Sequence, residues 1–225
     1  MIKAVFLDWG HTFTKSGFID TKANIDGLLK PFNLDWKSFY PFWRGIYILR
    51  SSNQIKSDKE MARWLRNVTG KEELPFEKLL DILIGKHIIP QENIETVRKL
   101  RKDYKVGILS NNVKEWIERN LHKHHIEDLF DAVIVSDEVG ARKPNAMIYA
   151  AALKAFFVKP EETVFVADET AEDLVGAKGC GMKTIWLDTG IEAEWSKKDR
   201  EMAGLFPPDA IVKKLPEIVP IIKRM

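Results

Sequence analysis

The sequence lacks three features: a second cysteine, a clear excess of charge of one sign, and a long apolar run. Because Cys180 is the only cysteine, an intramolecular disulfide is excluded and a reducing compartment, the cytoplasm, is expected. The 35 Lys and Arg residues nearly cancel the 33 Asp and Glu residues, which argues against nucleic acid or an acidic membrane as a partner. No apolar run reaches the length of a membrane span, and Asp8 interrupts the N-terminal run before a signal-peptide core could form.

Short apolar segments rich in β-branched residues predict a parallel sheet. With 45% hydrophobic and 30% charged residues, the composition is that of a globular protein with a sizeable core. Helices are expected to begin after Pro90, near Val113 and at Pro144, and a fourth to run from Ala171 toward Gly179. Strands that alternate with helices indicate an α/β fold with a doubly wound, Rossmann-like parallel sheet. The expected strands are 2–9, 105–111, 131–136, 163–168, 183–188 and 209–212.

Residues 18–89 break the alternation of strands and helices. This interval shows no strand pattern, is dense in aromatic residues, and is too long for a crossover between two strands. It is therefore expected to form a helical cap above the carboxyl edge of the sheet, inserted into a core of residues 1–17 and 90–225. Most of its aromatic side chains are expected to fill a small helix bundle. Trp43 and Arg44 are candidates for contact with a substrate.

Polar residues follow several of the predicted strands. Asp8 ends the first strand, Ser110-Asn111-Asn112 follow the second, and Asp168 and Asp173 follow the fourth. Lys143 precedes Pro144, at the expected start of the helix before that fourth strand. In a doubly wound sheet these strand ends meet at one edge, where ligands bind. The sequence therefore predicts three acids, one hydroxyl and one ammonium group in a single site.

The residue types at this edge suit the chemistry of a phosphoryl group. Two unit charges about 4 Å apart repel by about 4 kcal/mol at an effective dielectric constant of about 20, and a hard divalent cation such as Mg²⁺ removes that repulsion. An ionised Asp8 can then attack an electrophile. Ser110 offers a hydroxyl and backbone N–H groups to an anion, and Lys143 offers a fixed positive charge.

Four segments resemble the motifs of the haloacid dehalogenase-like hydrolase superfamily, most of whose members are Mg²⁺-dependent phosphatases. They are "FLDWGHTFT" (6–14), "ILSNN" (108–112), "RKPNAMIYAAAL" (142–153) and "VFVADETAEDLVGAKGCGMKTIWL" (164–187). The last is the most specific, since Asp168 and Asp173 stand at the family's spacing and Gly181 precedes the next strand. The interval 18–89 lies where the family places its mobile cap.

The resemblance implies a role for each candidate residue. Asp8 would be the nucleophile that forms an aspartyl-phosphate, Ser110 would bind the phosphoryl group, and Lys143 would pair with both the phosphate and Asp8. Thr12 would steady the motif loop. The catalytic set is Asp8, His11, Ser110 and Lys143, the substrate-binding set is Thr12, Trp43, Arg44 and Asn111, and the metal set is Asp8, the Gly10 carbonyl, Asp168 and Asp173.

The sequence departs from the family pattern at Gly10, where family phosphatases have a second Asp as general acid and base. Such assistance is typically worth a factor of about 10²–10⁴ in rate. Either His11, whose unperturbed pKa of about 6.5 suits proton transfer, replaces this acid, or His11 merely occupies the loop and the leaving groups need little protonation. A third possibility is different chemistry.

Two family members with different chemistry bear on that third possibility. Phosphonoacetaldehyde hydrolases share the "DW" start but need a cap lysine for a Schiff base, and no matching segment surrounds the cap lysines Lys30, Lys37, Lys56 or Lys59. Haloacid dehalogenases have a cap segment similar to "FWRGIYILR" (42–50), in which the arginine matching Arg44 binds the substrate carboxylate. They work without a metal, however, and lack the acid that Asp168 represents here.

The favoured prediction is Mg²⁺-dependent hydrolysis of a phosphate monoester, with a small phosphorylated metabolite as substrate. The alternatives are a 2-haloacid dehalogenase and a catalytically weak, phosphate-binding or regulatory protein. Neither the physiological substrate nor the oligomeric state follows from any pattern in the sequence.

Overall fold

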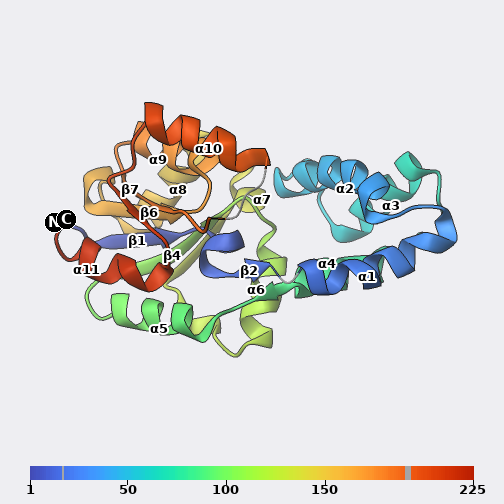
Figure 1. The fold of residues 1–225 in the computed structure, drawn as a ribbon, viewed down its shortest axis with the longest axis horizontal. Helices are drawn as coiled ribbons and strands as arrows, with labels where there is room; N and C mark the ends of the chain where they lie inside the picture. The colour runs from blue at the N-terminus through green and yellow to red at the C-terminus, as the bar shows by residue number, and fades with distance from the viewer. Residues whose placement is uncertain (17, 191–193) are drawn as a thin grey trace.

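A computed structural model describes residues 1–16, 18–190 and 194–225 (Figure 1). Its centre is a six-stranded sheet in the order β5-β4-β1-β6-β7-β8, in which every neighbouring pair is parallel. This confirms the doubly wound α/β prediction and all six expected strands, each shorter than expected by one to four residues. The strands are β1 (Ala4–Leu7), β4 (Lys105–Ser110), β5 (Ala132–Val135), β6 (Thr163–Ala167), β7 (Lys183–Leu187) and β8 (Ala210–Val212).

The register of the central strands places their carboxyl ends side by side. Leu7 of β1 pairs with Ile108 of β4 on one side and with Val166 of β6 on the other. All four residues of β1 are buried, because the strand lies inside the sheet and both of its faces are covered. The residues that follow β1, β4 and β6 therefore emerge at the same edge.

Each face of the sheet packs against its own helices. Val5 and Leu7 of β1 belong to the core cluster that contains residues of α5, α6 and α11, whereas Ala4 and Phe6 belong to the one with α8 and α9. This alternation follows from the two-residue period of a strand. Figure 1 shows α5 and α11 below the sheet and α8, α9 and α10 above it. These helices are α5 (Gln91–Leu100), α6 (Lys114–Lys123), α8 (Ala146–Phe156), α9 (Val175–Gly179), α10 (Glu194–Leu205) and α11 (Ile218–Ile222).

Two of the predicted helix N-termini, after Pro90 and near Val113, are correct to within one residue. The predicted N-terminus at Pro144 is wrong. The helix α8 begins at Ala146, and the side chain of Asn145 caps it by accepting the Met147 N–H at 2.9 Å. Asparagine is a strong N-cap residue, so it fixes the start here. The expected 171–179 helix consists of a π-helical turn, Thr170–Leu174, followed by α9.

Short helical elements connect the longer helices and strands. The helix α7 (Ser136–Val139) follows β5 directly, and a π-helical turn, Trp9–Phe13, follows β1. The 3₁₀ helices are Lys30–Phe32, Glu127–Leu129, Pro160–Glu162 and Leu215–Glu217. In the part of the chain that the structure describes, no helix combines the length and the apolar character that a membrane crossing requires.

Four helices between residues 18 and 85 form a group of their own, to one side of the sheet in Figure 1. They are α1 (Phe18–Leu29), α2 (Trp36–Ser51), α3 (Asp58–Thr69) and α4 (Phe76–Gly85), and we call them the cap. Their apolar side chains share one buried cluster that also includes Val113 and Trp116 of the core. The aromatic residues of 18–89 thus largely fill a helix bundle, as expected.

One expectation about residues 18–89 is wrong, because the interval contains a strand. The strand β3 (His87–Ile88) pairs antiparallel with β2 (Lys15–Ser16), with Lys15 opposite Ile88 and Ser16 opposite His87. Two residues are too few for a periodic pattern to identify from the sequence. This two-stranded ribbon is where the chain leaves the core and returns to it, so we call it the hinge ribbon.

Candidate active site

Asp8 lies at the end of β1 and is joined to a buried lysine. Its side chain is 11% exposed, and Oδ1 accepts a hydrogen bond from Nζ of Lys143 at 2.7 Å. The same ammonium group lies 2.8 Å from Oδ1 of Asp173, with the lysine side chain only 2% exposed. Burial opposes the charge of Lys143, but Asp173 and Asp8 outweigh burial and raise its pKa. The structure therefore brings three predicted residues into one ionic group.

Asp168 lies beside this group and is held by Thr12. The Thr12 hydroxyl donates to Oδ1 of Asp168 at 2.9 Å and accepts the Asp168 backbone N–H at 3.0 Å. Burial, and then the charges of Asp8 and Asp173, raise the pKa of Asp168 well above its usual value. Thr12 thus ties the loop after β1 to the end of β6.

The site carries more negative than positive charge. Burial raises the pKa of Asp173 well above its usual value, with a further contribution from Asp8, although Lys143 opposes the shift. Burial and the neighbouring Asp168 also raise the pKa of Glu169 to about 7. Lys143 compensates for only one of the carboxylates Asp8, Asp168 and Asp173. This excess, carried by hard oxygen atoms, fits a divalent cation.

The side chains alone do not form a complete metal cage. Within residues 1–16, 18–190 and 194–225, no three His, Cys, Asp or Glu side chains are grouped so that they could hold a metal ion. A cation at this edge would therefore need backbone or water oxygen atoms as further ligands, and Mg²⁺ characteristically keeps several waters.

Ser110 ends β4 and Asn111 follows it at the same edge, but their side chains have different surroundings. Ser110 is 4% exposed and lines the same cavity as Asp8. Asn111 also lines that cavity, yet its Oδ1 accepts the Lys143 backbone N–H at 2.7 Å and its Nδ2 donates to the Lys143 carbonyl at 3.2 Å. This two-way amide contact fixes the segment that carries Lys143, a role that the sequence did not indicate for Asn111.

The loop after β1 brings Gly10 and His11 to the cavity. Gly10 has extended backbone angles, with φ −70° and ψ 135°, and His11 has a left-handed φ of 55°. A Cβ atom at Gly10 would find only Oδ2 of Asp8 within 4 Å, at 4.0 Å. The backbone therefore does not require glycine at this position. Burial and Lys86 lower the pKa of His11, while Asp8 opposes the shift, so the imidazole is neutral near pH 7.

A cavity of about 560 Å³ lies between the core site and the cap. Trp43 and Arg44 of α2 both line it, as predicted; Trp43 is buried among aromatic rings and Arg44 is exposed. The rings of Trp43, Tyr47 and Trp116 stack nearly parallel, with centroids 5.9–6.3 Å apart. One wall of the cavity is therefore lined by aromatic rings.

The cavity residues that sequence reasoning missed include Tyr47, Trp116, Arg142 and Glu169. Tyr47 lies one helical turn after Trp43 and donates from its hydroxyl to the Asn111 carbonyl at 2.6 Å. The guanidinium of Arg142 lies 5.6 Å from the centre of the Tyr47 ring. The spacing of Tyr47 from Trp43 was a usable signal, whereas the position of Trp116 depends on tertiary packing.

His87 lies in the hinge ribbon next to this cavity and is held neutral. Its Nδ1 is 3.0 Å from the Thr14 hydroxyl, which itself donates to the Trp9 carbonyl at 3.0 Å. Burial, and then Lys86 and His11, lower the pKa of His87 to about 3. The unfolded chain takes up a proton near pH 6.5 that the folded chain does not accept, so this residue makes stability rise with pH from about 3 to 6.5.

We expect the variant His87→Asn to lose this pH dependence. Between pH 7 and pH 4 the wild type should lose about 3 kcal/mol more unfolding free energy than the variant, because asparagine has no proton to gain. Urea denaturation of both proteins at pH 4, 5, 6 and 7 measures this difference. Parallel stability curves across that range would show that His87 titrates normally in the folded protein.

These features first define a class: a Rossmann-like hydrolase with carboxylates at the strand ends and a helical insert after the first strand. The chain belongs to the haloacid dehalogenase-like hydrolase family, whose model matches residues 51–187.

Individual relatives agree with this assignment. A glyceraldehyde 3-phosphate phosphatase of Methanothermobacter thermautotrophicus is 31% identical over 208 residues, which cover 86% of this chain and 89% of that protein. One of Pyrococcus furiosus is 36% identical over 133 residues, which cover 58% of this chain and 52% of that protein, so this match spans about half of the relative. The L-2-haloacid dehalogenase of Xanthobacter autotrophicus superimposes over the full length of both chains with a TM-score of 0.73 at 19% identity, which shows the shared fold.

Proposed function

We propose that the protein hydrolyses phosphate monoesters of a small substrate, with Asp8 as the nucleophile. The observation that carries this proposal is the position of Lys143, which contacts Asp8 and Asp173 at 2.7 and 2.8 Å in a buried site. An adjacent ammonium group favours the ionised form of a carboxylate. Since Oδ1 of Asp8 accepts from Lys143, Oδ2 is the oxygen left for attack on phosphorus.

The reaction would proceed in two steps. In the first, the Asp8 oxygen forms a bond to phosphorus while the bond from phosphorus to the ester oxygen breaks, and the leaving alkoxide takes up a proton from solvent and departs as the alcohol. In the second, water cleaves the aspartyl-phosphate, which releases inorganic phosphate and restores Asp8. Ser110 and Lys143 would hold the phosphoryl oxygens through both steps, and the fixed contacts of Lys143 keep its charge in place without reorganisation.

Mg²⁺ is the proposed cofactor. The residues proposed to hold it directly are Asp8, Asp168 and the backbone carbonyl of Gly10, while Asp173 would hold waters of the ion. When bound, it would offset the excess carboxylate charge and polarise the phosphoryl oxygens. Thr12 would keep Asp168 turned toward the ion, because the Thr12 hydroxyl already occupies Oδ1 of Asp168 at 2.9 Å.

The cap, proposed to comprise residues 18–89, would receive the leaving group. Trp43 and Arg44 face the cavity from α2, and Tyr47 and Trp116 extend the aromatic wall. The relatives named as glyceraldehyde 3-phosphate phosphatases support a small phosphorylated substrate. We propose His11 as the group nearest to the leaving oxygen; with its lowered pKa it would act as a proton acceptor more readily than as a donor.

The position of Arg44 keeps dehalogenation as a second candidate function, because this residue lines the cavity from the cap. Asp168 opposes that reading, because its carboxylate would repel a halocarboxylate at the same edge. The absence of an acid at Gly10 likewise keeps a weak, phosphate-binding protein as an alternative.

An assay with p-nitrophenyl phosphate separates these readings. Removing Mg²⁺ with a chelator is expected to lower kcat/KM by about 10²-fold or more, because the metal contributes several kcal/mol, and added Mg²⁺ should restore it. The same preparation is tested for halide release from 2-chloropropionate. Chelator-resistant halide release would replace the phosphatase proposal with a dehalogenase, whereas phosphate binding without any turnover would favour the binding protein.

A further inference from the structure

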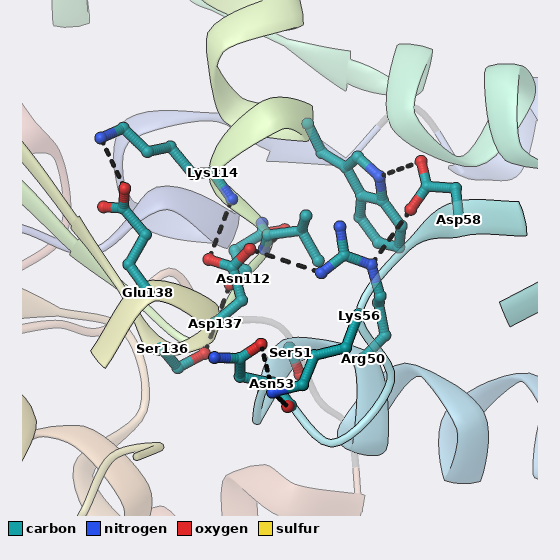
Figure 2. Close-up of polar contacts among 12 residues, drawn as sticks. Arg50, Ser51, Asn53, Lys56, Asp58, Asn112, Lys114, Ser136, Asp137 and Glu138 are labelled. Atoms are coloured by element: carbon teal, nitrogen blue, oxygen red, sulfur yellow. Dashed lines mark hydrogen bonds and ion pairs between the residues drawn. The ribbon is translucent and has the colours of Figure 1, made fainter. Parts of the chain in front are cut away.

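A buried arginine joins the cap to the core beside the active site. Arg50, near the end of α2, is 6% exposed. Its Nε donates to Oδ1 of Asp58 at 3.2 Å, and its Nη1 lies 3.5 Å from Oδ2 of Asp137. Asp58 begins α3 of the cap and Asp137 belongs to α7 of the core, and Figure 2 shows the guanidinium between the two carboxylates. The charge of Arg50 therefore bridges two parts of the structure.

Asp137 continues this connection to the turn of residues 110–113, which carries Ser110. Its Oδ1 accepts the Lys114 backbone N–H at 3.1 Å, and its own N–H donates to the Asn112 carbonyl at 3.4 Å. The Ser136 hydroxyl donates a hydrogen bond to the same carbonyl at 3.3 Å. Figure 2 shows Asp137 between Arg50 and the residues that follow the turn. Burial raises the pKa of Asp137, while the Lys114 backbone N–H and then Arg50 oppose that shift.

The turn 110–113 also contacts the cap at a second place. The Tyr47 hydroxyl donates to the Asn111 carbonyl at 2.6 Å. Tyr47 and Arg50 are three residues apart on α2, so they lie on one face of that helix. Trp116, three residues after the turn, donates from Nε1 to Oδ2 of Asp58 at 2.9 Å. One helix face thus reaches the turn directly through Tyr47 and indirectly through Arg50.

We propose that Arg50 and Asp137 are positioning residues, which fix the turn 110–113 against the cap so that Ser110 meets the phosphoryl group. This proposal rests on the proposed phosphatase function. A planar guanidinium holds its donors in a rigid, flat arrangement, whereas the ammonium of a lysine ends a flexible stem and does not impose that geometry on two carboxylates. Neither residue lines the cavity around Asp8, so each acts through the turn.

Two variants test the proposal. Asp137→Asn keeps the shape of the side chain but removes its charge, and Arg50→Lys keeps the charge but removes the planar guanidinium that contacts Asp58 and Asp137. For either variant we expect kcat with p-nitrophenyl phosphate and Mg²⁺ to fall about tenfold, since a charge-assisted hydrogen bond is typically worth that much or more. KM should change by less than about threefold, because the cavity walls are intact.

Arg119→Gln provides the matched control. Arg119 of α6 pairs with Asp81 of the cap at 2.7 Å, so it also joins core and cap, but both side chains are largely exposed, at 48% and 64%. We expect wild-type kcat and KM for this variant, because exposed pairs contribute little. If all three variants have the kcat of the wild type, or if Arg119→Gln shows the same loss as the others, the proposal is wrong.

Amide hydrogen exchange gives a readout that does not depend on turnover. In Asp137→Asn the backbone N–H groups of residues 112–116 should exchange about tenfold faster than in the wild type, while those of the hinge ribbon are unchanged. Faster exchange with no phosphatase activity in the wild type would refute the proposed function and leave the Arg50–Asp137 link standing. Unchanged exchange in Asp137→Asn would overturn the link itself.

Discussion

Replacing Asp8 by asparagine is expected to lower kcat/KM for p-nitrophenyl phosphate by about 10⁴-fold or more, the range seen when a nucleophile is removed. The amide has nearly the shape of the carboxylate, so it fits beside Lys143, but its oxygen is neutral and a poor nucleophile. Steady-state assays at saturating Mg²⁺ measure the loss. Mass spectrometry of acid-quenched enzyme should detect an added phosphoryl group on the wild type and none on Asp8→Asn.

Asp103→Asn is the control for Asp8→Asn. This substitution also removes one carboxylate. In the wild type, however, Asp103 pairs with Lys223 on the surface, where both side chains are at least half exposed. Wild-type activity is expected, because surface ion pairs contribute about 0–1 kcal/mol. Turnover in Asp8→Asn within about tenfold of the wild type would exclude Asp8 as the nucleophile and would leave the phosphoryl group to be attacked by water directly.

The position of the site was predictable because strand ends can be recognised from composition. The runs that end at Asp8, Ser110 and Asp168 are apolar and buried, and parallel pairing of Leu7 with both Ile108 and Val166 brings these ends to one level. The proposed pairing of Lys143 with Asp8 was implied by the resemblance of residues 142–153 to a family motif and not by any periodicity. The structure places it between two of the predicted acids.

The contacts between cap and core were not predictable in the same way. Tyr47 and Arg50 read as ordinary members of an aromatic, amphipathic helix, and their targets, Asn111 and Asp137, are 64 and 87 residues away. Such pairs depend on how the bundle sits on the sheet, which no local pattern encodes. The two-residue strand β3 was missed for a related reason, because only its pairing with β2 defines it.

The variant Gly10→Asp is expected to raise kcat for an alkyl phosphate such as glycerol phosphate by about 10²-fold, the lower end of the gain from general acid catalysis. The chain has room for it: the backbone at Gly10 is extended, with φ −70°, and a Cβ there has only Oδ2 of Asp8 nearby, at 4.0 Å. An alkyl alcohol is a poor leaving group unless it is protonated. For p-nitrophenyl phosphate, whose leaving group needs no proton, kcat should change by less than about threefold.

Gly10→Asn separates acid catalysis from other effects of a side chain at this position. Asparagine has nearly the volume and shape of aspartate but cannot transfer a proton, so it should leave kcat for glycerol phosphate at or below the wild-type level. A gain in both variants would mean that the side chain orders the loop after β1, and a gain in neither would mean that proton transfer to the leaving oxygen does not limit the rate. In the second case a new acid at this position brings no gain, and His11, which lines the cavity and whose pKa is influenced by Asp8, is the residue to replace next.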